Sequence, residues 1–144
     1  YWNERRSVQL GSSPAAVLSA SAGVEWGTFY GGHRETWSLQ ASYRPNPHLL
    51  LDLTQEYNDV RLPGGSFTTS LLGLRGTWNF SRSLLATAYA QVNTAADVAS
   101  LNARLRWMWR PASDVYLVFN RATGEGLERP TWQLLLKATW AILP

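Results

Sequence analysis

Residues 100–110 read Ser-Leu-Asn-Ala-Arg-Leu-Arg-Trp-Met-Trp-Arg, so large apolar side chains alternate with polar and cationic ones. Successive side chains of a β-strand point to opposite faces. One face of this strand would therefore hold Leu and Trp, and the other would hold Asn and Arg. A soluble strand usually alternates apolar residues with small polar ones. Large apolar residues opposite long cations are instead typical of a strand with lipid outside and a polar lumen inside.

The same alternation recurs along the chain in segments near the ~10 residues of a tilted membrane-spanning strand, each followed by turn residues. We expect eight strands, at residues 18–30, 36–44, 49–60, 68–80, 84–93, 100–110, 114–121 and 131–143. Residues 6–10 alternate more weakly, so the leading segment 1–17 is expected to hold part of an extra strand. Because bacterial single-chain barrels have even strand numbers, an odd count would indicate a piece of a larger barrel.

Composition excludes several other classes. The chain is 45% hydrophobic and 16% charged, and no apolar run approaches the ~18 residues of a spanning helix, which excludes a helical membrane protein. There is no Cys, so no disulfide framework or thiolate metal site is available. The net charge of +3 comes from arginines spread over alternating positions and turns. Nucleic acid is therefore not an expected partner.

The connections between the expected strands alternate in character. Residues 44–48, 79–83 and 110–114 are tight, whereas the other connections contain glycines or are longer, the longest being residues 122–130. This asymmetry predicts a short-turn rim facing the periplasm and a long-loop rim opposite it. Each tight turn carries an arginine: Arg44, Arg82 or Arg110. These residues are either ligands of headgroup phosphates or ordinary turn residues, and the sequence favours neither reading.

The expected outward faces hold aliphatic residues in the middle of the strands and aromatic residues near the ends, as interfacial aromatic belts require. Trp26, Trp37 and Trp132 are expected near the long-loop rim. The aromatic residues expected near the short-turn rim are Tyr43, Trp78, Trp107, Trp109 and Trp140. A soluble sandwich has no reason to sort tryptophans to both ends of its outward faces.

The opposite faces are polar, with acids on early strands and bases on later ones. The interior of a closed eight-stranded barrel is just wide enough for side chains. The expected lumen charge network therefore pairs Glu25, Asp52 and Glu56 across the lumen with Arg75, Arg104, Arg106 and Lys137. In eight strands this network would plug the lumen. In a wider barrel the same residues would line a pore and set its ion selectivity.

Candidate catalytic groups are sparse. His33 lies beside Glu35 in an expected loop, and His48 ends a proline-rich turn. A set of Ser38, His33 and Glu35 is conceivable, but nothing in the spacing selects it. Two histidines with scattered carboxylates fall short of a metal-site spacing. We therefore expect neither catalytic residues nor a metal or cofactor.

Residues 100–120, with the Arg-Pro-Ala-Ser-Asp turn at 110–114, resemble the carboxy-terminal barrel of a family of large bacterial outer-membrane proteins of unknown function. In that family an amino-terminal module similar to a family 9 carbohydrate-binding domain precedes the barrel. Residues 29–32, 43–48 and 56–63 are further similar fragments, so the resemblance covers most of the chain from about residue 29 onward. It implies an outer-membrane location and glycan handling, and it supplies no catalytic residues.

Together the sequence predicts an all-β fold, an antiparallel up-and-down transmembrane β-barrel of eight strands over residues 18–144. The expected role is a membrane anchor or small-solute path in the bacterial outer membrane, with the lumen plugged by ion pairs. The expected partners are the lipid bilayer, lipopolysaccharide, the barrel-assembly machinery, and an amino-terminal or separate periplasmic module. Two alternatives stay open: a soluble lipocalin-like barrel that binds an apolar ligand, and a barrel enzyme acting on lipid or glycan.

Overall fold

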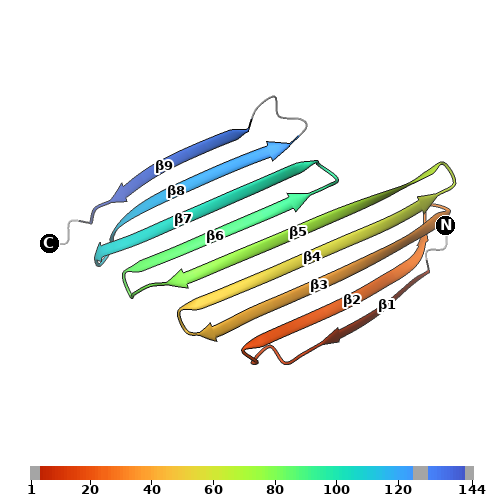
Figure 1. The fold of residues 1–144 in the computed structure, drawn as a ribbon, viewed down its shortest axis with the longest axis horizontal. Helices are drawn as coiled ribbons and strands as arrows, with labels where there is room; N and C mark the ends of the chain where they lie inside the picture. The colour runs from red at the N-terminus through yellow and green to blue at the C-terminus, as the bar shows by residue number, and fades with distance from the viewer. Residues whose placement is uncertain (1–3, 125–129, 142–144) are drawn as a thin grey trace.

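A computed structural model of the chain describes residues 4–124 and 130–141. These residues form a single antiparallel sheet in which each strand pairs with its neighbours in sequence (Figure 1). The strands are β1 (Arg5–Gly11), β2 (Leu18–Phe29), β3 (Gly32–Asn46), β4 (Leu49–Leu62), β5 (Gly65–Asn79), β6 (Leu84–Asn93), β7 (Val98–Arg110), β8 (Ser113–Gly124) and β9 (Thr131–Thr139). The predicted all-β, up-and-down antiparallel arrangement is confirmed. The described ranges contain no helix, and so none long and apolar enough to cross a membrane.

The turns alternate between the two ends of the sheet. We call the end with the turns β1–β2, β3–β4, β5–β6 and β7–β8 the first rim, and the opposite end the second rim (Figure 1). The first rim corresponds to the predicted short-turn rim, and the second rim to the predicted long-loop rim. The pairing is regular along most of each strand, with irregularities near the first rim between Tyr43 and Asn46 of β3 and between Met108 and Arg110 of β7.

In the part that the structure describes, two of the expected second-rim loops are shorter than expected, while the connection at residues 94–97 is as expected. Only Tyr30 and Gly31 join β2 to β3, and only Pro63 and Gly64 join β4 to β5. Tyr30 and Gly31 have φ values of 48° and 79°, as the type I′ turn of a tight hairpin requires. Because such a turn needs only two residues, the neighbouring Gly, His and Arg residues remain in the strands. Of the expected longest loop, residues 122–124 belong to β8, and residues 125–129 lie outside the described residues.

The sheet has one strand more than the eight expected, because residues of the leading segment form β1. Arg5–Gly11 pairs with β2 from Arg5 opposite Gly27 to Gly11 opposite Ser21. The sheet is also open, since β1 and β9 lie at opposite edges and do not pair (Figure 1). The expected eight-stranded closed barrel is therefore not what this chain forms in the structure, and closure stays a prediction. Local hairpin pairing fixes the meander, whereas closure depends on contacts between its two ends.

The sheet is one layer thick and has almost no core of its own. Val60, at 3% exposure, is the one buried hydrophobic residue in the described ranges. The chain exposes 10923 Å² of surface for its 16.1 kDa, whereas a compact monomer of that mass exposes roughly 7,400 Å². The sheet therefore leaves a large area of both faces to be covered by its surroundings.

Candidate functional site

The register places the aliphatic side chains of neighbouring strands on one face of the sheet, which we call the apolar face. Leu53 lies opposite Leu74, and Leu105 lies opposite Leu117, so apolar rows run across the strands. The exposed aliphatic residues of this face include Val8, Leu39, Leu72, Leu74, Leu101, Leu105, Leu117, Leu134 and Leu136. An apolar surface of this extent on a single-layer sheet is unstable in water.

Aromatic residues border the aliphatic band at both ends. Near the second rim, Trp37 lies opposite Tyr57 and is 52% exposed, and Trp132 on the edge strand β9 is 72% exposed. Trp26 lies one row closer to that rim and is half-buried. The first-rim aromatics expected from the sequence are all found near the first-rim turns, at Tyr43, Trp78, Trp107, Trp109 and Trp140.

Several of the first-rim rings touch one another. The ring of Trp78 stacks on that of Phe80 with centroids 5.0 Å apart. Trp109 lies at an irregularity in the pairing of β7 with β8, and its ring centroid is 6.1 Å from that of Trp107 and 5.7 Å from that of Trp140. This ring cluster joins the end of β7 to the residue that follows β9.

The apolar face becomes polar beyond the second-rim aromatics. Outside the row of Trp37 and Tyr57 lie Glu35 and Asp59, which are opposite one another, followed by Arg61. Arg61 Nη2 is 2.6 Å from Asp59 Oδ2. The aliphatic band is therefore limited at this end by an aromatic row and then by charged residues.

Both aromatic borders are inclined by a similar angle to the rows of directly paired residues, which run at right angles to the strands. Following paired residues straight across the sheet from Trp132 leads to Ala20 on β2, six residues from Trp26. In the same way, Tyr43 leads to Ala103 on β7, four residues from Trp107.

The number of residues by which a border departs from a row of directly paired residues gives the angle between the border and that row. The same angle is the tilt of the strands away from the perpendicular of the aliphatic band. The second-rim border shifts by six residues over the seven strand steps from β2 to β9, and the first-rim border by four residues over the four steps from β3 to β7. With ~3.3 Å per residue and ~4.8 Å between strands, both shifts correspond to an inclination of roughly 30–35°. Strands of transmembrane barrels are tilted by about 35–45°.

The other face, which we call the polar face, carries every residue of the predicted charge network. The register places Glu25, Asp52 and Glu56 there together with the predicted cations Arg75, Arg104, Arg106 and Lys137. Asp52 lies directly opposite Arg75, and Lys137 lies opposite Tyr116. The sequence therefore sorted these seven residues to one face correctly, while their pairing across a lumen stays a prediction.

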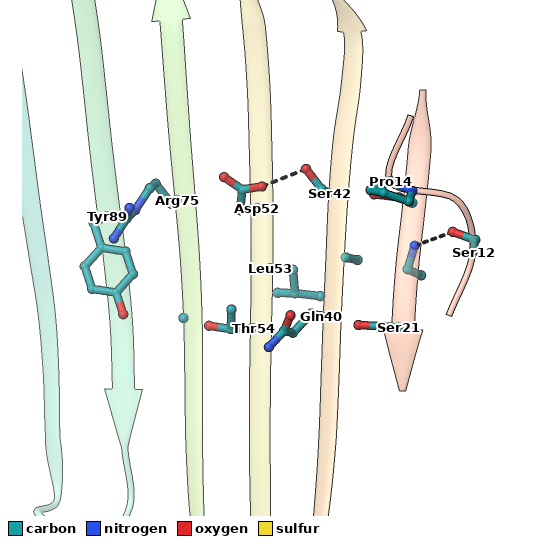
Figure 2. Close-up of a pocket in the computed structure, with 14 residues that line it drawn as sticks. Ser12, Pro14, Ser21, Gln40, Ser42, Asp52, Leu53, Thr54, Arg75 and Tyr89 are labelled. Atoms are coloured by element: carbon teal, nitrogen blue, oxygen red, sulfur yellow. Dashed lines mark hydrogen bonds between the residues drawn. The ribbon is translucent and has the colours of Figure 1, made fainter. Parts of the chain in front are cut away.

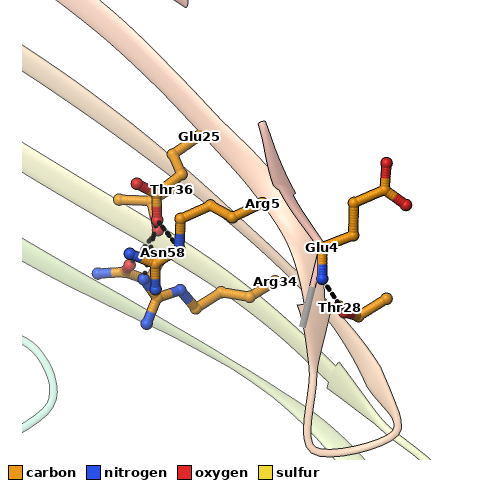
Figure 3. Close-up of polar contacts among 7 residues, drawn as sticks. All are labelled: Glu4, Arg5, Glu25, Thr28, Arg34, Thr36 and Asn58. Carbon is orange, nitrogen blue, oxygen red and sulfur yellow. Dashed lines mark hydrogen bonds and ion pairs between the residues drawn. The ribbon is translucent and has the colours of Figure 1, made fainter. Parts of the chain in front are cut away.

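The ion pairs of the polar face link neighbouring strands. Glu25 Oε1 lies 3.2 Å from Arg5 Nε and 3.2 Å from Arg34 Nη2, so β1, β2 and β3 share one carboxylate (Figure 3). Arg106 Nη2 donates to Asp114 Oδ2 at 2.8 Å. Sequence reasoning missed Arg5, Arg34 and Asp114 as partners. Recognition of the two-residue turn at Tyr30 and Gly31 would have revealed Arg34, because a tight hairpin fixes which residues lie side by side. Asp114 depends instead on the irregularity between Met108 and Arg110, which places it opposite Met108 and so on the face of Arg106.

A hollow of about 640 Å³ lies on the polar face over β2 to β6 (Figure 2). Asp52 accepts a hydrogen bond from the Ser42 hydroxyl at 2.7 Å, and the Arg75 guanidinium lies 5.2 Å from the centre of the Tyr89 ring. Gly73 forms part of its lining, and a Cβ there would lie 2.7 Å from Thr54 Oγ1 and 3.0 Å from the Tyr89 hydroxyl. The absence of a side chain at Gly73 thus lets Thr54 and Tyr89 lie close against its backbone.

The candidate catalytic residues are not assembled into a site. His33 and Glu35 lie on the apolar face outside the row of Trp37 and Tyr57, with Glu35 opposite Trp26, whereas Ser38 lies on the polar face opposite Glu56. His48 Nδ1 is 2.9 Å from the carbonyl oxygen of Asn79. The described residues contain no group of three or more His, Cys, Asp or Glu side chains that could hold a metal ion.

Comparison of the chain with protein-family models and with curated proteins finds no match.

Proposed function

We propose that this chain forms part of the wall of a transmembrane β-barrel in the bacterial outer membrane, with its apolar face toward lipid and its polar face toward the lumen. The observation that carries the proposal is the aliphatic band bordered by two aromatic rows with a common inclination. The tilt expected of spanning strands accounts for this inclination. A soluble sheet has no membrane plane along which its aromatic residues would align.

The dimensions of the band support the same proposal. Trp132 on β9 and Trp140 just after it are eight residues apart, about 27 Å along the chain, which at an inclination of roughly 30–35° corresponds to about 22–24 Å along the membrane normal. Trp37 and Tyr43 are six residues apart, about 20 Å along the strand and about 17 Å along the normal. An outward apolar band of about 25 Å is typical of outer-membrane barrels. The aromatic side chains would lie at the level of the lipid headgroups.

The two free edges need partners in lipid, because unpaired backbone groups are costly in a bilayer. In a meander of nine strands, β1 and β9 run in the same direction. An antiparallel closure therefore requires an odd number of further strands between them. We propose that the chain supplies nine strands of a larger barrel, as the resemblance to a family of large outer-membrane proteins also implies.

The polar face determines whether such a barrel is an anchor or a small-solute path. The ion pairs of Glu25 and Arg106 stay within the sheet, so they do not require side chains to cross the lumen. Arg104 and Lys137 have no ion pair among the described residues and would face the lumen. Lipopolysaccharide, the barrel-assembly machinery and a periplasmic module are the partners that this location implies.

Detergent dependence tests the proposal. We expect the complete barrel that contains this chain to fold as a β-sheet in detergent micelles or phosphatidylcholine vesicles, and the chain to aggregate in plain buffer. A folded, monodisperse monomer in buffer without detergent would contradict the membrane assignment. Planar-bilayer recording of the complete barrel then separates the two roles, because a path gives stable, ion-selective conductance and a plugged anchor gives none.

One observation favours a soluble barrel that binds an apolar ligand. The apolar face is hollowed by about 370 Å³ above Gly76, Ala86, Ala88 and Ala103, with larger apolar side chains around it. If the sheet curled with this face inward, the hollow could take an apolar ligand. A monomer in buffer whose tryptophan fluorescence responds to a fatty acid would support this alternative.

A further inference from the structure

The first rim carries arginines at three successive turns. Arg82 lies in the turn β5–β6, Arg110 is the last residue of β7, and Arg44 lies in β3, two residues before its end. The turns β3–β4, β5–β6 and β7–β8 follow one another along one side of the sheet (Figure 1). All three are exposed. No Asp or Glu occurs in the first-rim turns and the strand residues beside them, which are residues 12–17, 44–48, 80–83 and 110–113.

In the described ranges, the three first-rim arginines have no acidic partner. Most of the arginines toward the second rim, in contrast, form ion pairs with acidic residues. None of the three side chains lies within ion-pair distance of a carboxylate in residues 4–124 or 130–141, and Asp114, the nearest acid in sequence to Arg110, pairs with Arg106. Toward the second rim, by contrast, four arginines are ion-paired: Arg5 and Arg34 with Glu25, Arg6 with Glu4, and Arg61 with Asp59. Figure 3 shows the shared carboxylate of Glu25.

Each of the three arginines lies beside an aromatic residue. Tyr43 precedes Arg44, Phe80 lies two residues before Arg82, and Trp109 precedes Arg110. The Arg110 guanidinium also lies 5.9 Å from the centre of the Trp140 ring. Aromatic rings favour the boundary between acyl chains and headgroups, and arginines just outside that boundary lie at the level of the phosphates. A soluble turn arginine has no need of this repeated neighbour.

We propose that Arg44, Arg82 and Arg110 bind the phosphate groups of anionic lipids, so that the first rim docks on an anionic membrane surface. The proposal rests on the proposed function. Turns that are two strands apart are separated by roughly 10 Å, so each guanidinium meets a different headgroup. A guanidinium matches a phosphate in geometry and can bind it with two hydrogen bonds. Each basic residue near an anionic surface strengthens binding roughly fivefold.

The test compares partitioning of the complete barrel that contains this chain into phosphatidylcholine vesicles with and without one third phosphatidylglycerol. We expect the wild-type chain to insert into both and to prefer the anionic vesicles, with the preference weakening at high salt. The variant Arg44→Gln, Arg82→Gln, Arg110→Gln should lose most of this preference, roughly a 100-fold effect if the three contributions multiply. The single variant Arg82→Gln, in an exposed turn, should lose about fivefold.

The matched control removes three arginines toward the second rim, as Arg6→Gln, Arg61→Gln, Arg121→Gln, and should keep the preference. Equal loss in both triple variants would assign the effect to net charge and overturn the proposal. A wild-type chain that inserts equally well into both kinds of vesicle would overturn it and leave the membrane assignment intact. Failure to insert into either kind would refute the membrane assignment itself, and the docking proposal with it.

Discussion

Leu74 lies in the middle of the aliphatic band, and its replacement by arginine gives the sharpest test of which face contacts lipid. The side chain is 49% exposed on the apolar face, between Leu53 and Ala90 on the neighbouring strands. The first-rim aromatic on the same strand, Trp78, is four residues away, about 13 Å along the strand. A guanidinium at position 74 would therefore remain in the hydrocarbon region.

The expected cost of Leu74→Arg follows from this depth. Arginine on the lipid face near the bilayer midplane lowers the free energy of unfolding by about 2–4 kcal/mol, which is roughly a 30- to 900-fold change in the folding equilibrium. The measurement is denaturant unfolding in phosphatidylcholine vesicles followed by tryptophan fluorescence. The slope of free energy against denaturant should remain that of the wild-type chain, since the surface exposed on unfolding changes little.

Thr77→Arg is the matched control, because Thr77 lies on the same strand and faces the polar side opposite Leu50 and Thr87. A substitution on a solvated face usually changes stability by about 0.5 kcal/mol or less. Similar losses for Leu74→Arg and Thr77→Arg would refute the assignment of the faces. A larger loss for Thr77→Arg would indicate that the sheet is inserted with the opposite face toward lipid.

Three further outcomes are expected. Gly73→Val should cost about 1–3 kcal/mol in the same unfolding assay, since its side chain would crowd Thr54 Oγ1 and the Tyr89 hydroxyl, whereas Gly76→Ala, whose Cβ would come no closer than 3.4 Å to Leu51, should be tolerated. Equal losses would show that Thr54 and Tyr89 move aside at little cost. Trp140→Leu should lower the free energy of unfolding by about 0.5–1.5 kcal/mol more than the loss of buried apolar area explains, because its ring contact with Trp109 is lost. An unchanged unfolding midpoint would show that this ring contact does not stabilise the sheet. Hydrogen exchange on the chain in micelles should be fast at alternate amides of β1 and β9 and slow along β4, because the edge strands pair on one side only whereas β4 pairs with both β3 and β5. Uniform protection would indicate that the edges pair with each other or with another copy.

The sequence determined the strand pattern because side-chain alternation is a local property. The sorting of Leu74 and Arg75 to opposite faces follows from their adjacency in one strand, and the seven predicted charges fall on one face for the same reason. The positions of tryptophans near strand ends also follow from the strand limits alone. The errors at the second rim arose at Tyr30 and Gly31, where a two-residue turn replaced an expected loop.

Only the tertiary structure decided two kinds of feature. The first depends on the register between strands, and the second depends on whether the two edge strands pair. The common inclination of the aromatic borders appears only when Trp132 is traced across seven strand pairings to Ala20. The partners of Glu25 depend in the same way on β1, whose weak alternation gave little indication of its pairing. Closure of the sheet is even less predictable from the sequence, because it depends on the pairing of edge strands, which no local pattern specifies. Alternation has a period of two residues and thus fixes faces, whereas register and closure depend on the relative placement of distant segments.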